Sequence, residues 1–395
     1  MGRGETSGAM NDVNGKGLLP PGMNDILPPE AGFETATVNR LLGVFHAHGY
    51  AQVKPPLVEF EASLLAGAGT AMTQQTFRLM DPVSHAMLGL RADMTLQVAR
   101  IATTRLAHEA RPLRLCYAGQ VLQVSGSQMR PERQVGQAGI ELIGTESARA
   151  DVEVIALAHE ALSTLGIEGL SVDLNVPTLV PAICAALNLD EGETARVRVA
   201  LDSKDAGAIA ALGNGASNLL TGLLKAAGPA EAALAALAAL ELPAAAAAAC
   251  ASLKEIVTLL AERVPGIRLT VDPVENRGFE YHTGIAFVLF ALGARGELGR
   301  GGRYLAGGAG VPNGAEPATG FTLFMDTVIS ALSAAQMPER VFVPLGDGAA
   351  VAQLQADGWI TVAGLDAAAD PVAEAQRLGC THVYKNGRTI AVADA

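Results

Sequence analysis

The chain has 395 residues, half of them hydrophobic and 17% of them charged, which is typical of a globular protein with two or three domains. It carries 28 Lys and Arg against 40 Asp and Glu, which gives a net charge of −12 at pH 7. Nucleic-acid binding draws most of its affinity from Lys and Arg on phosphates, so this acidic balance argues against a nucleic-acid-binding protein.

The first part of the chain predicts a tail, a helix and several strands. Residues 1–17 are small and polar, which is typical of a disordered tail without the apolar centre of a signal peptide. After a turn-rich stretch, a helix is predicted to end at Gly49, because apolar residues recur at helical spacing at Val38, Leu41, Leu42 and Phe45. The patterns that follow predict strands at 50–60, 111–124, 136–144 and 170–176, two short strands around an Asp-Pro turn within 77–95, and helices at 96–110 and 147–166.

The order of these elements favours an antiparallel sheet, because adjacent strands are joined by short turns. Residues 178–262 are dominated by Ala and Leu and predict a helical insert with a structural role. The glycine-rich stretch 293–310 lacks the phosphate-loop pattern and predicts a tight turn between two buried strands. A boundary near Met337 separates a predicted core, residues 18–335, from a small C-terminal α/β domain, residues 338–395.

No pattern in the chain indicates a nucleophile, a metal site or a membrane span. The four cysteines are far apart and form no CxxC pair, which fits reduced thiols in the cytoplasm. The two histidines of FHAHG lie two residues apart, so on a helix they point in different directions and do not converge on a metal. No apolar run reaches the roughly 18 residues of a membrane helix.

Polar side chains embedded in predicted strands form the main candidate binding site. They are Asp93, Thr95, Gln137, Glu141, Arg277, Tyr281 and His282. Gln137 and Glu141 are four residues apart and therefore share one face of a strand. An arginine fork suits a carboxylate, and an acid with neutral acceptors suits an ammonium group, so the set predicts a pocket for a zwitterion. The alternative is that each polar group is satisfied by its own neighbours.

Several segments, in the order found here, resemble the class II catalytic domain of histidyl-tRNA synthetase over residues 18–335. They are LPPGMNDILP, LRADMT, GQVLQVSGSQMRPERQVGQAGIELIG, RGFEYHTG, GGRY and GFTLFMD. The resemblance implies an α+β fold, in which a class II aminoacyl-tRNA synthetase-like antiparallel sheet is flanked by helices.

The same resemblance assigns roles around a bound histidine. It places Asp93, Thr95 and Gln137 at the α-amino group, Glu141 at the imidazole and Arg277 at the carboxylate. It brings Tyr281, His282 and Tyr304 into the same pocket. The chain departs from the family where His282 replaces a tyrosine and Asp93 replaces a glutamate.

The nucleotide side of the site departs further from the family. Gln123 and Ser125 stand where the second class-defining motif has an arginine and a glutamate, and Thr327 stands near the place of the third motif's arginine. Charged hydrogen bonds are worth roughly 1.5–3 kcal/mol each, so two missing arginines weaken ATP binding about a hundredfold or more. Arg130 and Arg133 lie near this vacated site and are candidates for another ligand, such as a phosphoribosyl compound.

A chain that keeps the amino-acid pocket and lacks the ATP arginines is similar to the regulatory subunits of ATP phosphoribosyltransferase. This resemblance implies a protein without catalytic activity, cofactor or metal, which assists a short-form catalytic subunit at the first step of histidine biosynthesis. It also implies histidine feedback, homodimers within a hetero-oligomer, and no binding of tRNA or membrane. Two alternatives stay open, namely an active divergent histidyl-tRNA synthetase or histidine ligase, and a scaffold that binds no ligand.

Overall fold

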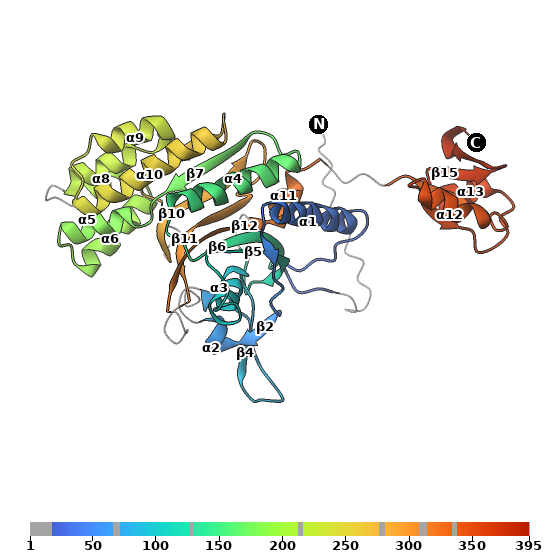
Figure 1. Cartoon of the computed structure of the whole chain (residues 1–395), viewed down its shortest axis with the longest axis horizontal. Helices are drawn as coiled ribbons and strands as arrows, with labels where there is room; N and C mark the ends of the chain where they lie inside the picture. Colours follow the sequence, from blue (N-terminus) through green and yellow to red (C-terminus); the bar gives the residue numbers. More distant parts are fainter. Residues whose placement is uncertain are drawn as a thin grey trace, which may run out of the picture. The chain divides into compact units, whose positions relative to one another are not determined.

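The structure is a computed structural model, and it describes residues 18–65, 72–126, 130–211, 216–275, 281–307, 314–333 and 338–394. The chain divides into two compact units (Figure 1). Residues 18–27 and 31–333 belong to the larger unit, and residues 338–394 make up the body of the smaller one.

Within the described residues, the larger unit is built on a nine-stranded sheet. Its spatial order is β1 (Ala51–Gln52), β5 (Leu113–Leu122), β6 (Gln134–Ile143), β12 (Glu316–Phe324), β11 (Gly299–Ala306), β10 (His282–Ala291), β7 (Leu170–Asn175), β9 (Arg268–Val271) and β8 (Gly228–Pro229). The strands from β5 to β7 in this order pair antiparallel. At the margins, the pairs β1–β5 and β7–β9 are parallel and the pair β8–β9 is antiparallel, so the predicted antiparallel sheet describes the centre of a mixed sheet.

A separate three-stranded antiparallel sheet consists of β2 (Val58–Phe60), β4 (Met87–Leu90) and β3 (Arg78–Met80). The prediction of two short strands around an Asp-Pro turn is confirmed by β3 and β4. The prediction of a single strand over 50–60 is wrong, because β1 joins the large sheet and β2 joins the small one. Pro55 and Pro56 lie between them and have no N–H group for a strand ladder.

The two faces of the large sheet are covered differently. One face packs against α1 (Glu30–Ala47) and α4 (Ala148–Thr164), and the other lies under α3 (Thr95–Thr104) (Figure 1). Two further short helices in this unit are α2 (Glu61–Leu64) and α11 (Met325–Ser330). Along β6, Ile140 and Leu142 belong to the core under α1 and α4. Because side chains alternate along a strand, Gln137 and Glu141 point to the face that carries α3.

The residues predicted as an Ala-rich insert fold mainly as helices. In the described part of the chain these are α5 (Leu179–Ala186), α6 (Glu191–Asp202), α7 (Ala206–Ala210), α8 (Ala216–Lys225), α9 (Ala230–Ala238) and α10 (Ala244–Arg263). The two-residue strand β8 between α8 and α9 was not predicted, and it pairs with β9.

Helix α10 corrects one expectation about apolar segments. By length and composition it is long and apolar enough to cross a membrane, because its alanine run and its leucines fall within one helix. Its inward side contributes Ala246, Leu253, Ile256 and Leu260 to the main core. Its contacts with α4, α5 and α9 place it as a packed helix of the insert.

The smaller unit is an α/β fold of its own. Its elements are β13 (Arg340–Val343), α12 (Ala349–Ala356), β14 (Ile360–Ala363), α13 (Pro371–Arg377), β15 (His382–Lys385), β16 (Arg388–Ala391) and a final 3₁₀ turn (Val392–Asp394). The strand order is β14-β13-β15-β16, and only the last pair is antiparallel. Phe342 faces one small core and Val341 the other, as expected for a central strand covered on both sides.

Candidate functional site

Two adjoining cavities lie on the face of the large sheet that carries α3. Their volumes are 300 Å³ and 60 Å³. The residues that line both are Asp93, Thr95, Tyr281, Arg300, Tyr304 and Phe324. The larger cavity also includes Gln137, and the smaller one reaches Glu141 and His282. Seven of the eight residues predicted to bind histidine therefore meet here, while Arg277 lies outside the described residues.

One end of the site is organised around the Asp93 carboxylate. Gln137 Nε2 donates to Asp93 Oδ2 at 3.0 Å, and the Thr95 backbone N–H donates to Asp93 Oδ1 at 2.8 Å. Gln137 Oε1 accepts the backbone N–H of Met94 at 3.1 Å, so the amide orientation is fixed. A carboxylate held beside a hydroxyl and an amide oxygen supplies the acceptors that an ammonium group needs, since that group only donates.

The other end of the site is formed by a fully buried carboxyl group. Glu141 is 1% exposed, and its Oε2 accepts a hydrogen bond from the Tyr304 hydroxyl at 2.8 Å. Burial raises the pKa of Glu141 to about 8, and the hydrogen bonds from Tyr304 and Thr95 offset only part of this shift. Glu141 therefore exchanges its proton near neutral pH, in the range where an unperturbed imidazole also titrates.

Glycines line the smaller cavity beside Glu141. In the sheet register Glu141 lies opposite Gly320, which lies opposite Gly302. A methyl group at Gly320 would lie 2.1 Å from Glu141 Oε2, and one at Gly302 would lie 2.6 Å from the His282 ring. The Tyr281 and His282 ring centroids lie 4.1 Å apart at the margin of the smaller cavity. Gly302 and Gly320 thus form a glycine floor on which the His282 ring and the Glu141 carboxyl lie directly, at the wall of the smaller cavity.

The sequence analysis missed two hydroxyl groups that join the ends of the site. The Tyr117 hydroxyl lies 2.7 Å from Thr322 Oγ1 and 3.3 Å from Thr95 Oγ1, and it donates to Glu141 Oε1 at 3.4 Å. Burial raises the pKa of Tyr117 well above its ordinary value, so the phenol stays protonated. A methyl group at Gly139 would lie 2.6 Å from that hydroxyl. The glycine between Gln137 and Glu141 was therefore the available signal for this contact.

The vacated nucleotide positions are dispersed. Gln123 lines the larger cavity. Ser125 is exposed, and Thr327 is buried in the first turn of α11; neither lines the two cavities. Of the two arginines considered for another ligand, Arg130 lines the larger cavity and Arg133 lines neither.

An ionic cluster that was not predicted occupies this half of the site. Glu297 forms ion pairs with both Arg130 and Arg300. The Arg130 guanidinium lies over the Phe324 ring, 3.9 Å from its centroid. Glu132 lines the same cavity, so its arginines are matched by carboxylates rather than left as a cradle for several phosphates.

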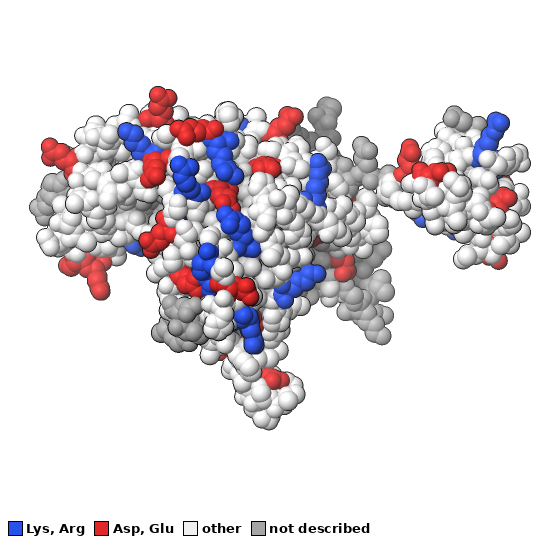
Figure 2. Space-filling view, viewed as in Figure 1, with Lys and Arg blue, Asp and Glu red and all other residues white. Residues whose placement is uncertain are grey.

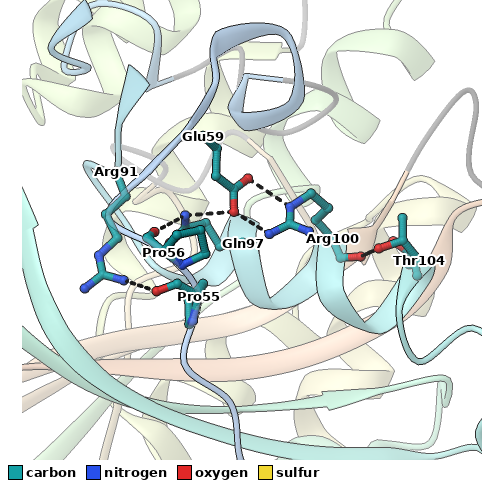
Figure 3. A network of polar contacts seen from close by, with 8 residues as sticks. Pro55, Pro56, Glu59, Arg91, Gln97, Arg100 and Thr104 are labelled. Carbon is teal, nitrogen blue, oxygen red and sulfur yellow. Dashed lines mark hydrogen bonds and ion pairs between the residues drawn. The ribbon is translucent and has the colours of Figure 1, made fainter. Parts of the chain in front are cut away.

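A polar network fixes the segment that carries Asp93 and Thr95 (Figure 3). Arg91, 6% exposed, donates to the carbonyls of Gln120 at 2.7 Å and Pro55 at 3.0 Å. In the same network, Gln97 Nε2 donates to the Pro56 carbonyl at 2.8 Å and to Glu59 at 3.0 Å. Arg100 Nε donates to Glu59 at 2.9 Å. The start of α3 is thereby tied to the loop between β1 and β2.

Outside these two cavities, the described residues show no clear sign of a metal site or of a surface for nucleic acid. Among the described residues, no group of three His, Cys, Asp or Glu side chains is arranged to hold a metal ion. On the face shown in Figure 2, Lys and Arg of the larger unit are interspersed with Asp and Glu and form no continuous basic surface.

Comparisons with known proteins match nearly the whole chain. The sequence model of the histidyl-tRNA synthetase family matches residues 22–328. A protein of Paramagnetospirillum magneticum named ATP phosphoribosyltransferase regulatory subunit is 57% identical over 94% of this chain and 97% of its own length. A protein of the same name from Rhodospirillum centenum is 54% identical over 95% and 97%.

Solved structures confirm the fold class. A crystal structure of an ATP phosphoribosyltransferase regulatory subunit/histidyl-tRNA synthetase from Bacillus halodurans matches with a TM-score of 0.78 and 24% identity, over 91% of this chain and 96% of that one. Histidyl-tRNA synthetase from Nostoc matches with a TM-score of 0.77 and 18% identity, over 93% and 90%. The expected synthetase-like fold is therefore correct, with a mixed rather than purely antiparallel sheet.

Proposed function

The chain belongs to the ATP phosphoribosyltransferase regulatory subunit family, and from this premise we propose that it binds free histidine and mediates feedback inhibition of that enzyme. It is the regulatory subunit of a complex at the first step of histidine biosynthesis, and it does not catalyse the reaction itself. Histidine occupies the pocket that a synthetase uses for its amino-acid substrate.

The observation that carries this proposal is the pairing of two chemically different ends in one site. Asp93 and Gln137 offer a carboxylate and an amide to the α-amino group. Glu141, buried beside Gly320 and Gly302, offers a carboxyl group to the imidazole. A carboxyl that titrates near neutral pH suits an imidazole, because either partner can carry the shared proton.

The nucleotide half of the site supports a regulatory rather than a catalytic role. Gln123 lines the cavity at the place of an arginine, and Thr327 does not reach it. Arg130 and Arg300 are engaged by Glu297, and Glu132 adds a further carboxylate to the cavity wall. A polyphosphate placed here would meet acidic side chains, and charge stabilisation at phosphorus would be weak.

The partners follow from the same family. The protein acts with the short-form catalytic subunit, as a dimer within a hetero-oligomer and without tRNA, cofactor or membrane. Histidine shifts the populations of two arrangements of the complex if it binds them unequally, and a coupling of about 1–3 kcal/mol gives a useful range of inhibition. The four free thiols support a reducing, cytoplasmic setting.

Titration calorimetry of the chain, alone and with its catalytic subunit, tests the proposal. We expect saturable histidine binding at one site per chain. The complex assayed with and without histidine is expected to lose phosphoribosyltransferase activity as that site fills. Absence of histidine binding in both preparations would contradict the proposal.

The rival function is an active histidyl-tRNA synthetase or histidine ligase. It predicts exchange of pyrophosphate into ATP that depends on histidine, because adenylate formation is reversible. We expect no exchange above background for the isolated chain. Exchange at a rate typical of a synthetase would replace the regulatory function with a catalytic one.

A further inference from the structure

We propose that Arg300 binds the carboxylate of the ligand and thereby makes the site specific for amino acids over amines of the same ring. The proposal rests on the histidine-binding function inferred above. The resemblance to histidyl-tRNA synthetase gave no role to Arg300. Among the described residues that line the two cavities, Arg300 is the arginine common to both.

The position of Arg300 on β11 brings it to the correct face. Arg300, Gly302 and Tyr304 occupy every second position of the strand and therefore share one face. Tyr304 donates to Glu141 at 2.8 Å, so this face is the α3 side. Arg300 pairs with Thr322, whose hydroxyl belongs to the cluster that joins the two ends of the site. Arg300 is thus two residues, or about 7 Å, along the sheet from the row that contains Glu141.

That spacing matches the shape of the ligand. With the imidazole in the smaller cavity beside Glu141 and the ammonium group at Asp93, the remaining carboxylate points along β11 toward Arg300. The protein groups that meet the ligand then come from the strands of the sheet floor and from the start of α3. Each functional group of the amino acid meets a side chain of complementary charge or hydrogen-bonding type.

The ionic cluster gives Arg300 the charge and orientation that a carboxylate needs. Glu297 accepts from Arg300 Nε at 3.1 Å and from Nη2 at 2.5 Å, which fixes the plane of the guanidinium. Arg130 pairs with the same Glu297, so the carboxylate that orients Arg300 is itself held from a second side. A ligand carboxylate meets a complementary guanidinium at Arg300, whereas an uncharged or cationic group does not.

The test compares histidine with histamine, which has the same ring and amine but no carboxylate. Titrations use the full chain, alone and with its catalytic subunit. For Arg300→Gln we expect histidine affinity to fall about tenfold or more, as for loss of a charged hydrogen-bonded pair, and histamine affinity to change less than about twofold. Arg300→Lys keeps the charge without the fork and should fall in between.

Arg295→Gln is the matched control, because Arg295 is exposed in the same β10–β11 turn and lines neither cavity. It should bind both ligands like the wild type, and thermal unfolding should verify that each variant is folded. Equal losses for histidine and histamine in Arg300→Gln would overturn the carboxylate assignment, and so would no loss for either. A selective loss of histidine in Arg277→Gln with none in Arg300→Gln would assign the role to Arg277. If the wild type binds neither ligand, the proposed function fails together with this assignment.

Discussion

At the scale of single residues, the site depends on burying a carboxyl group whose hydrogen-bond partners, among the described residues, are neutral hydroxyl groups. Glu141 receives hydrogen bonds from Tyr304 and Tyr117, and both phenols are themselves buried. Neutral donors do not repay the cost of removing a carboxylate from water, so the proton is retained up to about pH 8. The free site is therefore electrically neutral at this end over much of the physiological range.

Glu141→Gln tests this through the pH dependence of stability. The pKa is about 8 in the folded chain and near 4.5 when exposed, so between these values the folded state binds more protons than the unfolded state. The free energy of unfolding therefore falls as pH rises through this window, by about 1.36 kcal/mol for each unit that the pKa is raised. Between pH 5 and pH 8 the wild type should lose on the order of 3 kcal/mol more than Glu141→Gln.

Urea unfolding at several pH values measures the difference. Glu168→Gln, at an exposed position outside the site, serves as the control and should follow the wild type. Parallel curves for the wild type and Glu141→Gln would show that Glu141 is already ionised in the folded chain.

Single residues also mark how far sequence reasoning reaches. Gln137 and Glu141 were placed on one face because strand alternation depends only on spacing, and the structure agrees. Tyr117 and Thr322 come from strands that hold further polar residues, such as Arg114 and Thr319, and only the register of β5 and β12 against β6 shows which of them face the site. Arg300 and Glu297 were hidden in a glycine-rich stretch interpreted as a turn, although its second half is strand β11.

At the scale of elements, the site is a junction of three supports. The strands β6, β12 and β11 form its floor, and the start of α3 lies at the end of the site that contains Asp93. The polar network in Figure 3 ties α3 to the loop that precedes β2. The order of the elements was predictable from apolar periodicity. The split between β1 and β2 was not, since it depends on which sheet each half of the segment joins.

Gly320→Ala tests the glycine floor of this junction. A methyl group there would lie 2.1 Å from Glu141 Oε2 and 2.4 Å from the Ile140 carbonyl oxygen, so side chain and backbone must both move. We expect destabilisation of about 1–3 kcal/mol and loss of histidine binding by tenfold or more, because the Glu141 carboxyl is pushed out of its position at the cavity wall. Urea unfolding and calorimetry measure the two effects.

Gly43→Ala is the matched control for that substitution. Gly43 lies within α1, where an added methyl group meets no atom within 4 Å. Alanine should raise the free energy of unfolding by about 0.5–1 kcal/mol, and histidine binding should be unchanged. Normal histidine affinity in Gly320→Ala would mean that the ligand does not depend on the position of the Glu141 carboxyl.

At the scale of the whole molecule, the proposed function requires that a pocket which binds histidine without transforming it controls chemistry in another subunit. The larger unit keeps the fold that a synthetase uses to bring an amino acid and ATP together, as its likeness to both kinds of solved structure indicates. If histidine binds here as proposed, its binding free energy is available for shifting the complex between arrangements. The ion pairs of Glu297 with Arg130 and Arg300 lie in the half of the site where the resemblance places the nucleotide. Sequence patterns indicated the loss of two arginines, but Glu297 and Arg300 are distant in sequence from those positions, so this cluster could be found only from the fold.

Asp93→Asn in the assembled complex separates activation of the catalytic subunit from feedback. The substitution removes the negative charge expected to hold the ammonium group and keeps an oxygen that can accept from Gln137 Nε2. The variant complex should retain phosphoribosyltransferase activity close to that of the wild type, since Asp93 lines the ligand cavities rather than an outer surface. Half-inhibition should require a histidine concentration about tenfold higher or more, the usual effect of losing a charged hydrogen bond.

Asp347→Asn, exposed in the smaller unit, should leave activity and inhibition unchanged. Because the two readouts come from one assay, unaltered inhibition of the Asp93→Asn complex would place the histidine that inhibits the enzyme somewhere other than this pocket.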